Sequence, residues 1–439
     1  MKLKIAFLIG GMAVAQFTGS AAAQVAAAPQ PAAASVETSP AGPPFLAWDS
    51  FTDELRQLGN KMVANLPVSN LPERLRNDPQ VQQETGRLLL EALAERTIEA
   101  IGADDHPVFL PGSNVTLNVG QPNADTTYRS ATISPGGTYR LRGDRGSLRI
   151  LKLGQFGPMP EKASSGISVF AYNDLNALHL DASGQIDVIL SPTRPAGYNG
   201  DWWQLAPAAN TLLLRQVDFD WSRERDPRIS IERLDKPVER PRPDAAELER
   251  RLRGLAKSTG NIAFFLVDHV EGLRREGYIN RLKEFDVSHL GGLVGQFYYE
   301  GAYELSSDEA LILEAKVPAN CTYWSAILTN DIYETTDWYN NQSSLNGAQA
   351  RVDRDGVVRI VVSAKDPGVP NWLDTAGYPT GAIQGRWTDC SATPIPTLRK
   401  IPLADVRREL PADTPVVTPA QRDQTLRDRR ALVQQRPLW

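Results

Sequence analysis

Two segments of the chain carry polar and aromatic side chains in a combination that could bind or transform a small molecule. The first, residues 121–129, is a turn-rich run entering an expected strand, and it supplies Asp125, Tyr128 and Arg129. The second, residues 323–387, supplies the remaining ligand-binding candidates, which are Trp324, Asn346, Gln349, Arg351, Lys365, Asp366, Asn371, Trp372 and Asp374. Aromatic faces stack on C–H groups, while amides and charged groups hydrogen-bond hydroxyls. If both segments border one hollow, they predict a cleft for a small polar or amphiphilic ligand.

The same residue types are compatible with two other functions. Carboxylates such as Asp125, Asp366 or Asp374, together with Tyr128, could act as general acid and base in a metal-independent lyase, isomerase or hydrolase. Such chemistry requires a carboxyl pKa that burial moves toward neutrality. In a purely structural envelope component, these side chains would instead form turns and satisfy local backbone donors, as expected for residues 366–371. The sequence assigns no catalytic residue and leaves the three hypotheses open.

Metal, nucleotide and nucleic-acid chemistry are not supported. The four histidines, at positions 106, 179, 269 and 289, stand without the spacing of a metal-ligand pair, and His269 lies in an apolar run typical of a core residue. The chain has no nucleophile-elbow, phosphate-loop or dinucleotide-binding glycine motif. Residues 353–356 resemble the start of a calcium loop, but a hairpin turn explains them. Net charge is −5 and the basic residues are scattered. We therefore expect no metal, no cofactor and no nucleic-acid partner.

The N-terminus predicts export. Lys2 and Lys4 precede an apolar stretch, residues 5–17, which is followed by small residues up to Ala23. This is the pattern of a signal peptide (residues 1–23) cleaved after Ala23, and the Ala/Pro-rich residues 24–44 then form a flexible leader. The apolar run is too short to span a bilayer, so we expect no integral membrane segment after cleavage and a periplasmic or secreted location. An uncleaved, tethered form is the alternative.

The chain has two cysteines, Cys321 and Cys390. An oxidising compartment would allow them to form a disulfide, which in the chain-entropy treatment stabilises a loop of that length by roughly 4 kcal/mol. Two buried free thiols are the alternative.

Helix and strand patterns alternate in blocks along the chain. They predict an N-terminal helical layer (45–105), a first β region (106–243), a helical block (244–295), a second β region (296–395) and a C-terminal tail (396–439). This order favours an α+β fold with antiparallel, sandwich-like sheets. Within it we expect a helix from about Asp78 to Ile101, a hairpin turned by residues 143–146, and a solvated helix or loose terminus in the arginine-rich tail.

Three strings, residues 122–129, 343–350 and 366–377, resemble signatures of the bacterial domain-of-unknown-function family 1214, which often occurs with family 1254. The close resemblance covers about residues 295–390, with fainter similarity back to about Phe45. It implies an exported, β-sandwich-like protein of the cell envelope, and it brings no agreed activity or catalytic residue. Cys321 and Cys390 depart from the family pattern, so their disulfide would be a local feature of this chain.

Overall fold

The computed structural model describes residues 49–57, 71–158, 168–239, 245–287 and 291–437. The predicted signal peptide (1–23) and leader (24–44) lie outside these ranges. Within them, no helix has the length and apolarity required to cross a membrane.

The first β region is a sandwich of two sheets. One sheet has the order β1-β2-β8-β4-β5 and the other β7-β6-β3-β9. Both sheets contribute to one core, in which Leu153 and Leu214 from the first pack with Leu141 and Val188 from the second. The strands are β1 (Leu110–Pro111), β2 (Thr126–Thr132), β3 (Tyr139–Asp144), β4 (Ile150–Gly157), β5 (Ser168–Asp174), β6 (Gln185–Ser191), β7 (Asp201–Gln204), β8 (Thr211–Val217) and β9 (Arg228–Arg233).

The hairpin predicted around residues 143–146 is wrong. Strand β3 pairs with β6 and β9, whereas β4 pairs with β5 and β8 in the facing sheet. The connection therefore carries the chain across the sandwich, and Gly146 (φ +68°) permits it because a Cβ there would lie 2.2 Å from the carbonyl oxygen of Arg225. The alternation of apolar and polar residues would place Tyr139, Leu141, Leu151 and Leu153 in one core whether β3 and β4 formed a hairpin or lay in facing sheets. The sequence pattern alone therefore cannot distinguish a hairpin from a crossing between sheets.

The second β region is also a sandwich. Its sheets have the orders β10-β11-β17-β13-β14 and β16-β15-β12-β18. Trp324 and Ile383 from the first pack against Leu313 and Ile360 from the second in a shared core. The strands are β10 (Lys283–Phe285), β11 (Gln296–Glu304), β12 (Glu309–Lys316), β13 (Cys321–Thr329), β14 (Ser344–Asn346), β15 (Val357–Ser363), β16 (Trp372–Asp374), β17 (Thr380–Cys390) and β18 (Thr397–Pro402).

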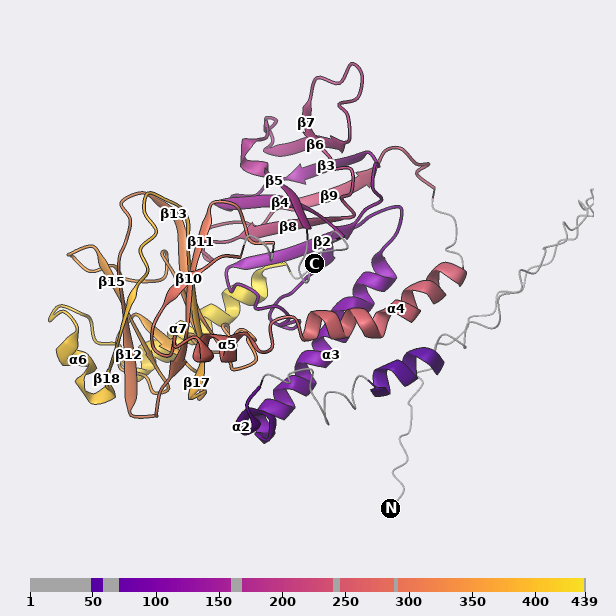
Figure 1. The fold of residues 1–439 in the computed structure, drawn as a ribbon. Coiled ribbons are helices and arrows are strands. Elements are labelled where there is room, and N and C mark those ends of the chain that lie inside the picture. Colours follow the sequence, from indigo (N-terminus) through magenta and orange to yellow (C-terminus); the bar gives the residue numbers. More distant parts are fainter. Residues whose placement is uncertain (1–48, 58–70, 159–167, 240–244, 288–290, 438–439) are drawn as a thin grey trace, which may run out of the picture. The chain divides into compact units, whose positions relative to one another are not determined.

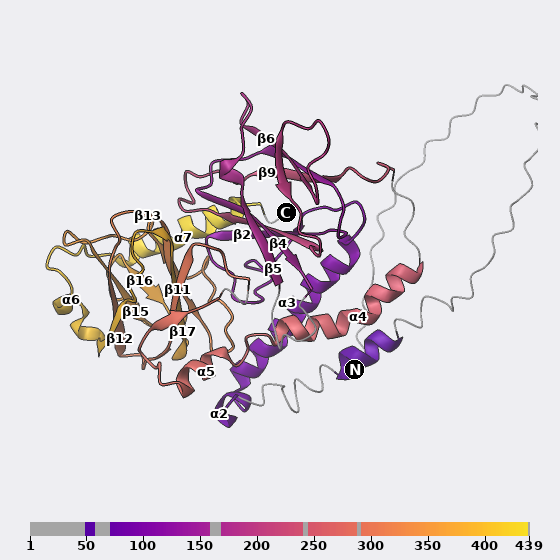
Figure 2. The same ribbon diagram turned by 45° about the horizontal axis from the view of Figure 1, so that its top comes forward.

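Helices precede and separate the two sandwiches, which confirms the α+β class (Figure 1). Residues 49–57 are helical, and α2 (Glu73–Arg76) and α3 (Pro79–Gly102) follow. As predicted, α3 begins with a capping Asp78, whose side chain accepts a hydrogen bond from Gln80 N, and with a proline in its first turn. Helix α4 (Ala245–Ala263) lies alongside α3 in both ribbon views, and α5 (His269–Arg275) contacts β11 (Figure 2).

The C-terminal tail is more ordered than predicted. After α6 (Val406–Glu409), helix α7 (Pro419–Gln435) starts with a Thr418–Gln421 capping box. Arg422 and Arg429 are only 5% and 6% exposed. Arg422 pairs with Asp366 (2.9 Å), and Arg429 donates to the carbonyl oxygen of Trp338 (2.7 Å). The prediction of a solvated helix is thus wrong for the face of α7 that carries Arg422 and Arg429. The spacing of charged residues in the sequence does not show whether an arginine is solvated or donates to buried acceptors.

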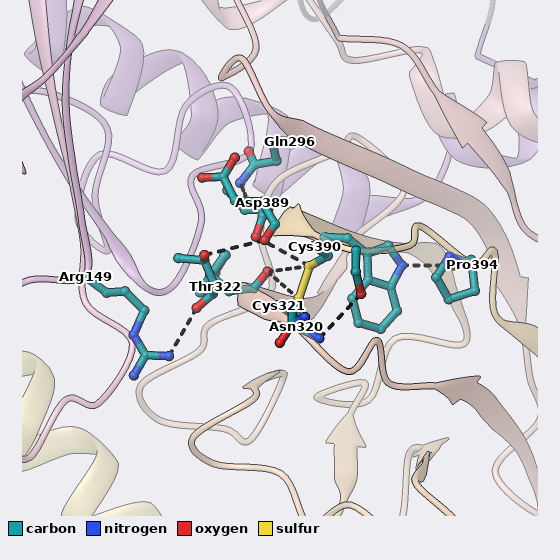
Figure 3. The surroundings of a disulfide bond; sticks show 12 residues. Arg149, Gln296, Asn320, Cys321, Thr322, Asp389, Cys390 and Pro394 are labelled. Carbon is teal, nitrogen blue, oxygen red and sulfur yellow. Dashed lines mark hydrogen bonds between the residues drawn. A yellow bond between two sulfur atoms is a disulfide. The ribbon is translucent and has the colours of Figure 1, made fainter.

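Cys321 and Cys390 form a disulfide, as predicted. It joins the first residue of β13 to the last residue of β17, where the two strands pair directly (Figure 3). Beside it, Arg149 of the first sandwich donates to the carbonyl oxygen of Thr322 (3.1 Å). The bridge therefore fixes a strand pair at the junction between the two sandwiches.

Replacing both cysteines, in C321S/C390S, should lower the free energy of unfolding by about 4 kcal/mol. Without the disulfide, the long loop between the two positions regains its conformational entropy in the unfolded chain. Urea denaturation of parent and variant measures the difference. Adding a reductant should destabilise the parent and leave the variant unchanged. Equal stabilities of the oxidised parent and the variant would contradict the expectation.

Candidate functional site

Asp125 connects the two polar segments. Its side chain lies in the loop before β2, with only 2% of the residue exposed. The carboxylate accepts hydrogen bonds from Trp221 Nε1 (2.9 Å), the Tyr323 hydroxyl (2.7 Å) and Asn346 Nδ2 (2.9 Å). Burial raises the pKa of Asp125, while these three hydrogen bonds act in the opposite direction. Trp221 lies between β8 and β9 of the first sandwich, whereas Tyr323 and Asn346 belong to the second, so Asp125 bonds the two together.

Several other candidates hold loops of the second sandwich. Trp324 packs in the core against Trp387. Trp372 is buried and donates to the carbonyl oxygen of Ser363 (3.1 Å). Asn371 accepts from Arg351 N (2.8 Å) and donates to Arg351 O (2.7 Å). These side chains bond to protein atoms of their own neighbourhood.

The remaining candidates make contacts that do not include the carboxylate of Asp125. Lys365 pairs with Asp308 (2.7 Å) at the surface, and Asp366 pairs with Arg422 of α7. Asp374 accepts from Ala376 N, and burial raises the pKa of the Asp374 carboxyl to about 6. Gln349 lines a separate pocket beneath α7. Asp366 lies close enough to Asp374 to contribute to its raised pKa, but neither carboxyl group acts on that of Asp125.

Tyr128 and Arg129 occupy opposite faces of β2, as neighbouring strand residues must. Arg129 lies 5.7 Å from the ring of Phe109 and lines a wide basin of about 1880 Å³. Burial raises the pKa of Asp218, which also lines that basin, to about 7. The arginines of this basin alternate with acidic residues. Tyr128 lines a different, smaller cavity.

This smaller cavity measures about 470 Å³ and lies between the two sandwiches. Strands β2, β4 and β8 contribute the face turned away from the core of the first sandwich, and β11 and β17 contribute the corresponding face of the second. The end of α4 and the segment that joins α4 to α5 add further apolar side chains. The apolar wall of the cavity includes Phe156, Leu213, Ile262, Phe265 and Leu266. The volume is within the range of small-molecule sites.

Two arginines line the cavity from opposite sandwiches. Arg215, on β8, is half-buried, and Arg386, on β17, is 4% exposed. Among the described residues, no carboxylate lies within ion-pair distance of either, and the Nε atom of each is buried without a hydrogen-bond partner. Arg215 donates to Gly291 O (2.8 Å) and Arg386 to Gln384 Oε1 (2.6 Å). Two positive charges are therefore held here without an opposite charge beside them.

Tyrosines surround these guanidinium groups. Arg215 lies 5.8 Å from the ring centre of Tyr128 and 5.6 Å from that of Tyr172, and Arg386 lies 5.1 Å from that of Tyr298. Aromatic faces attract guanidinium groups without neutralising them. Burial raises the pKa of Tyr172 to about 12, so its hydroxyl remains protonated.

A hydrogen-bonded chain leads from Arg386 to His269. Gln384 Nε2 donates to the Tyr333 hydroxyl (2.5 Å), which donates to the fully buried Glu300 (3.2 Å). Glu300 also bonds His269 Nε2 (2.8 Å). The histidine predicted as a core residue is thus half-buried and bound to a carboxylate. In the part of the chain that the structure describes, no group of three or more His, Cys, Asp or Glu residues could hold a metal ion.

Arg215 and Arg386 are not among the site residues predicted from the sequence. The available signal was a single arginine on the outward face of each strand, in 212–215 and 382–387. An arginine on the outward face of a strand normally points into solvent. Here the two sandwiches face each other, so both arginines line the cavity between them.

Comparison with known proteins agrees with the resemblance seen in the sequence. Residues 302–382 match the family described as "Protein of unknown function (DUF1214)". These residues are a DUF1214 domain. The domain ends just before Gln384 and Arg386, and its strands build much of the second sandwich. No curated protein matches the chain.

The similarity to a solved structure extends beyond the DUF1214 domain. An uncharacterized protein from Burkholderia cenocepacia is 27% identical, with a TM-score of 0.74, and the match covers 82% of this chain and 98% of that one. The VPA0106 protein from Vibrio parahaemolyticus is 13% identical, with a TM-score of 0.42, and the match covers 72% of this chain and 99% of that one.

The variant Asp125→Asn should lower the free energy of unfolding by about 2 kcal/mol. The amide NH₂ group of asparagine would take the place of a carboxylate oxygen that accepts a hydrogen bond, so two donors would face each other. Urea denaturation measures this change. The control is Asp308→Asn, which removes an exposed ion pair with Lys365 and should leave the unfolding midpoint in place. A shift of the same size in both variants would contradict the role assigned to Asp125.

Replacing Arg386 should have little effect on the stability of the ligand-free protein, or should raise it. Arg386→Met removes a buried charge that has no ionic partner among the residues that the structure describes, and we expect a change within about 1 kcal/mol. The matched control is Arg422→Met, which is as deeply buried but leaves Asp366 unpaired and should cost about 3 kcal/mol. Denaturation is measured on protein refolded from urea to remove bound compounds. A larger loss for Arg386 than for Arg422 would show that Arg386 is structural.

Proposed function

We propose that this protein binds a small amphiphilic ligand in the cavity between the two sandwiches. The observation that carries the proposal is a set of buried polar atoms, on residues that line a partly apolar cavity, that have no hydrogen-bond partner among the described residues. They are Arg215 Nε, Arg386 Nε and Gln121 Nε2. Leaving a buried donor unsatisfied costs about 1–3 kcal/mol. A ligand that accepts hydrogen bonds would offset that cost.

The walls fit an amphiphilic ligand better than a fully polar one. Phe156, Leu213, Ile262 and Leu266 offer carbon surface along one part of the cavity, while the arginines and tyrosines occupy another. Ligand pockets commonly combine a mostly apolar lining with a few placed polar groups. The binding hypothesis from the sequence is therefore retained, with Tyr128 as the one candidate residue that lines this cavity.

The acid–base alternative has less support. Tyr128 faces the cavity, but the carboxylate of Asp125 is engaged by three donors, and Asp366 and Asp374 lie in another part of the second sandwich. General acid–base catalysis needs its two groups within reach of one substrate. A purely structural role suits Asn371 and Asp366, but it gives no reason for the unpaired arginines.

The cell envelope is the proposed location. The disulfide fits an oxidising compartment, and the N-terminal sequence pattern supports export.

Leu213→Trp should abolish ligand binding by filling the cavity from β8. The probe is N-phenyl-1-naphthylamine, a neutral aromatic amine whose fluorescence rises in apolar surroundings. We expect saturable binding to the parent protein and none to Leu213→Trp. The control Leu234→Trp places the same side chain at an exposed position and should bind as the parent does. Unchanged binding to Leu213→Trp, or no binding to the parent, would refute the proposed cavity function.

A further inference from the structure

We infer that the ligand carries a carboxylate head group, which Arg215 and Arg386 bind together from opposite sides of the cavity. This inference rests on the proposed function and adds the chemical class of the ligand. Its basis is the placement of two positively charged side chains, from separate sandwiches, on the lining of one cavity.

The charges that line the cavity do not cancel. Glu95, Glu99 and Arg96 are the other charged residues of the lining, and both glutamates pair with Arg96. Arg215 and Arg386 are left without an acidic partner among the described residues. Two buried carboxylates act near Arg386 without pairing with it. Asp125 is engaged by three donors, and Glu300 is linked to Arg386 only through Gln384 and Tyr333. The cavity therefore has an excess of positive charge where these two arginines meet.

The unsatisfied atoms match an anionic acceptor. Arginine stays protonated and can be satisfied only by acceptors, and a carboxylate supplies two oxygens in the geometry of a guanidinium fork. Arg429 shows the contrast, because it too lacks a carboxylate but donates to Trp338 O and Ser344 Oγ. Within the described ranges, Arg215 and Arg386 have no such protein acceptor for Nε. A cationic ligand would be repelled, and a neutral alcohol would leave the charge uncompensated.

The tyrosines hold the arginines in place. Tyr172 and Arg215 both donate to Gly291 O, and the ring of Tyr298 lies beside Arg386. The guanidinium groups are thereby positioned before a ligand arrives, which lowers the entropy lost on binding. The apolar body of the ligand would then lie along Phe156, Leu213 and Leu266.

The test compares two fluorescent probes that differ by one acidic group. The first, 1-anilinonaphthalene-8-sulfonate, carries a sulfonate on the aromatic amine; the second, N-phenyl-1-naphthylamine, lacks it. We expect the anionic probe to bind at least about tenfold more tightly, as one charge-assisted interaction implies. Decanoate should displace it, whereas decanol at the same concentration should not.

Variants assign the preference to the arginines. In Arg215→Gln and in Arg386→Gln the preference for the anionic probe should fall about tenfold or more, while the neutral probe still binds. Arg129→Gln, on the opposite face of β2, should keep the preference. Leu213→Trp should abolish binding of both probes, which excludes nonspecific surface binding.

The outcomes separate the two claims. If neither probe binds the parent protein, the proposed function fails. If both probes bind equally, or if the preference survives both arginine replacements, the cavity binds ligands but the carboxylate inference is overturned. If inorganic phosphate displaces the anionic probe as well as decanoate does, the site selects charge without an apolar body, and the inference is likewise overturned.

Discussion

The buried carboxylate of Asp125 lies where the two sandwiches meet, and the cavity beside it depends on that contact. Its donors, Trp221, Tyr323 and Asn346, come from segments far apart in the chain. Ile150 and Val217 pack against Tyr323 in the same region, so apolar contact supports the hydrogen bonds. A buried carboxylate needs hydrogen bonds to all its acceptor atoms. The three hydrogen bonds of Asp125 therefore hold the two sandwiches at a set distance, and this distance determines the width of the cavity.

The contact between the two sandwiches places Arg215 and Arg386 on opposite sides of one cavity. This placement does not contribute to the stability of the fold. A protein gains nothing from burying guanidinium groups without partners, and it commonly gains stability when they are replaced. Arg422 and Arg436 of the C-terminal segment show the stabilising arrangement, since both pair with acidic residues. Arg215 and Arg386 lack it. The contrast within one chain separates side chains that hold the fold from side chains that we assign to a ligand.

Local features of the fold could be predicted from the sequence, and long-range ones could not. Asp78 and Pro79 mark the start of α3 because capping is decided within one helical turn. The supposed hairpin at residues 143–146 was wrong because β3 and β4 satisfy the same alternation in facing sheets. Asp125 was selected for its chemistry, yet its partners lie 96, 198 and 221 residues away in the chain. Arg215 and Arg386 escaped notice because each lies alone in its strand.

A crystal structure of the protein purified from a periplasmic extract, without unfolding, tests the central claim most directly. The account predicts density for a non-protein compound between the sandwiches, with an acidic group in hydrogen-bond contact with Arg215 and Arg386. It would be contradicted by a cavity filled with the chain's own side chains, or by a carboxylate of the chain paired with either arginine.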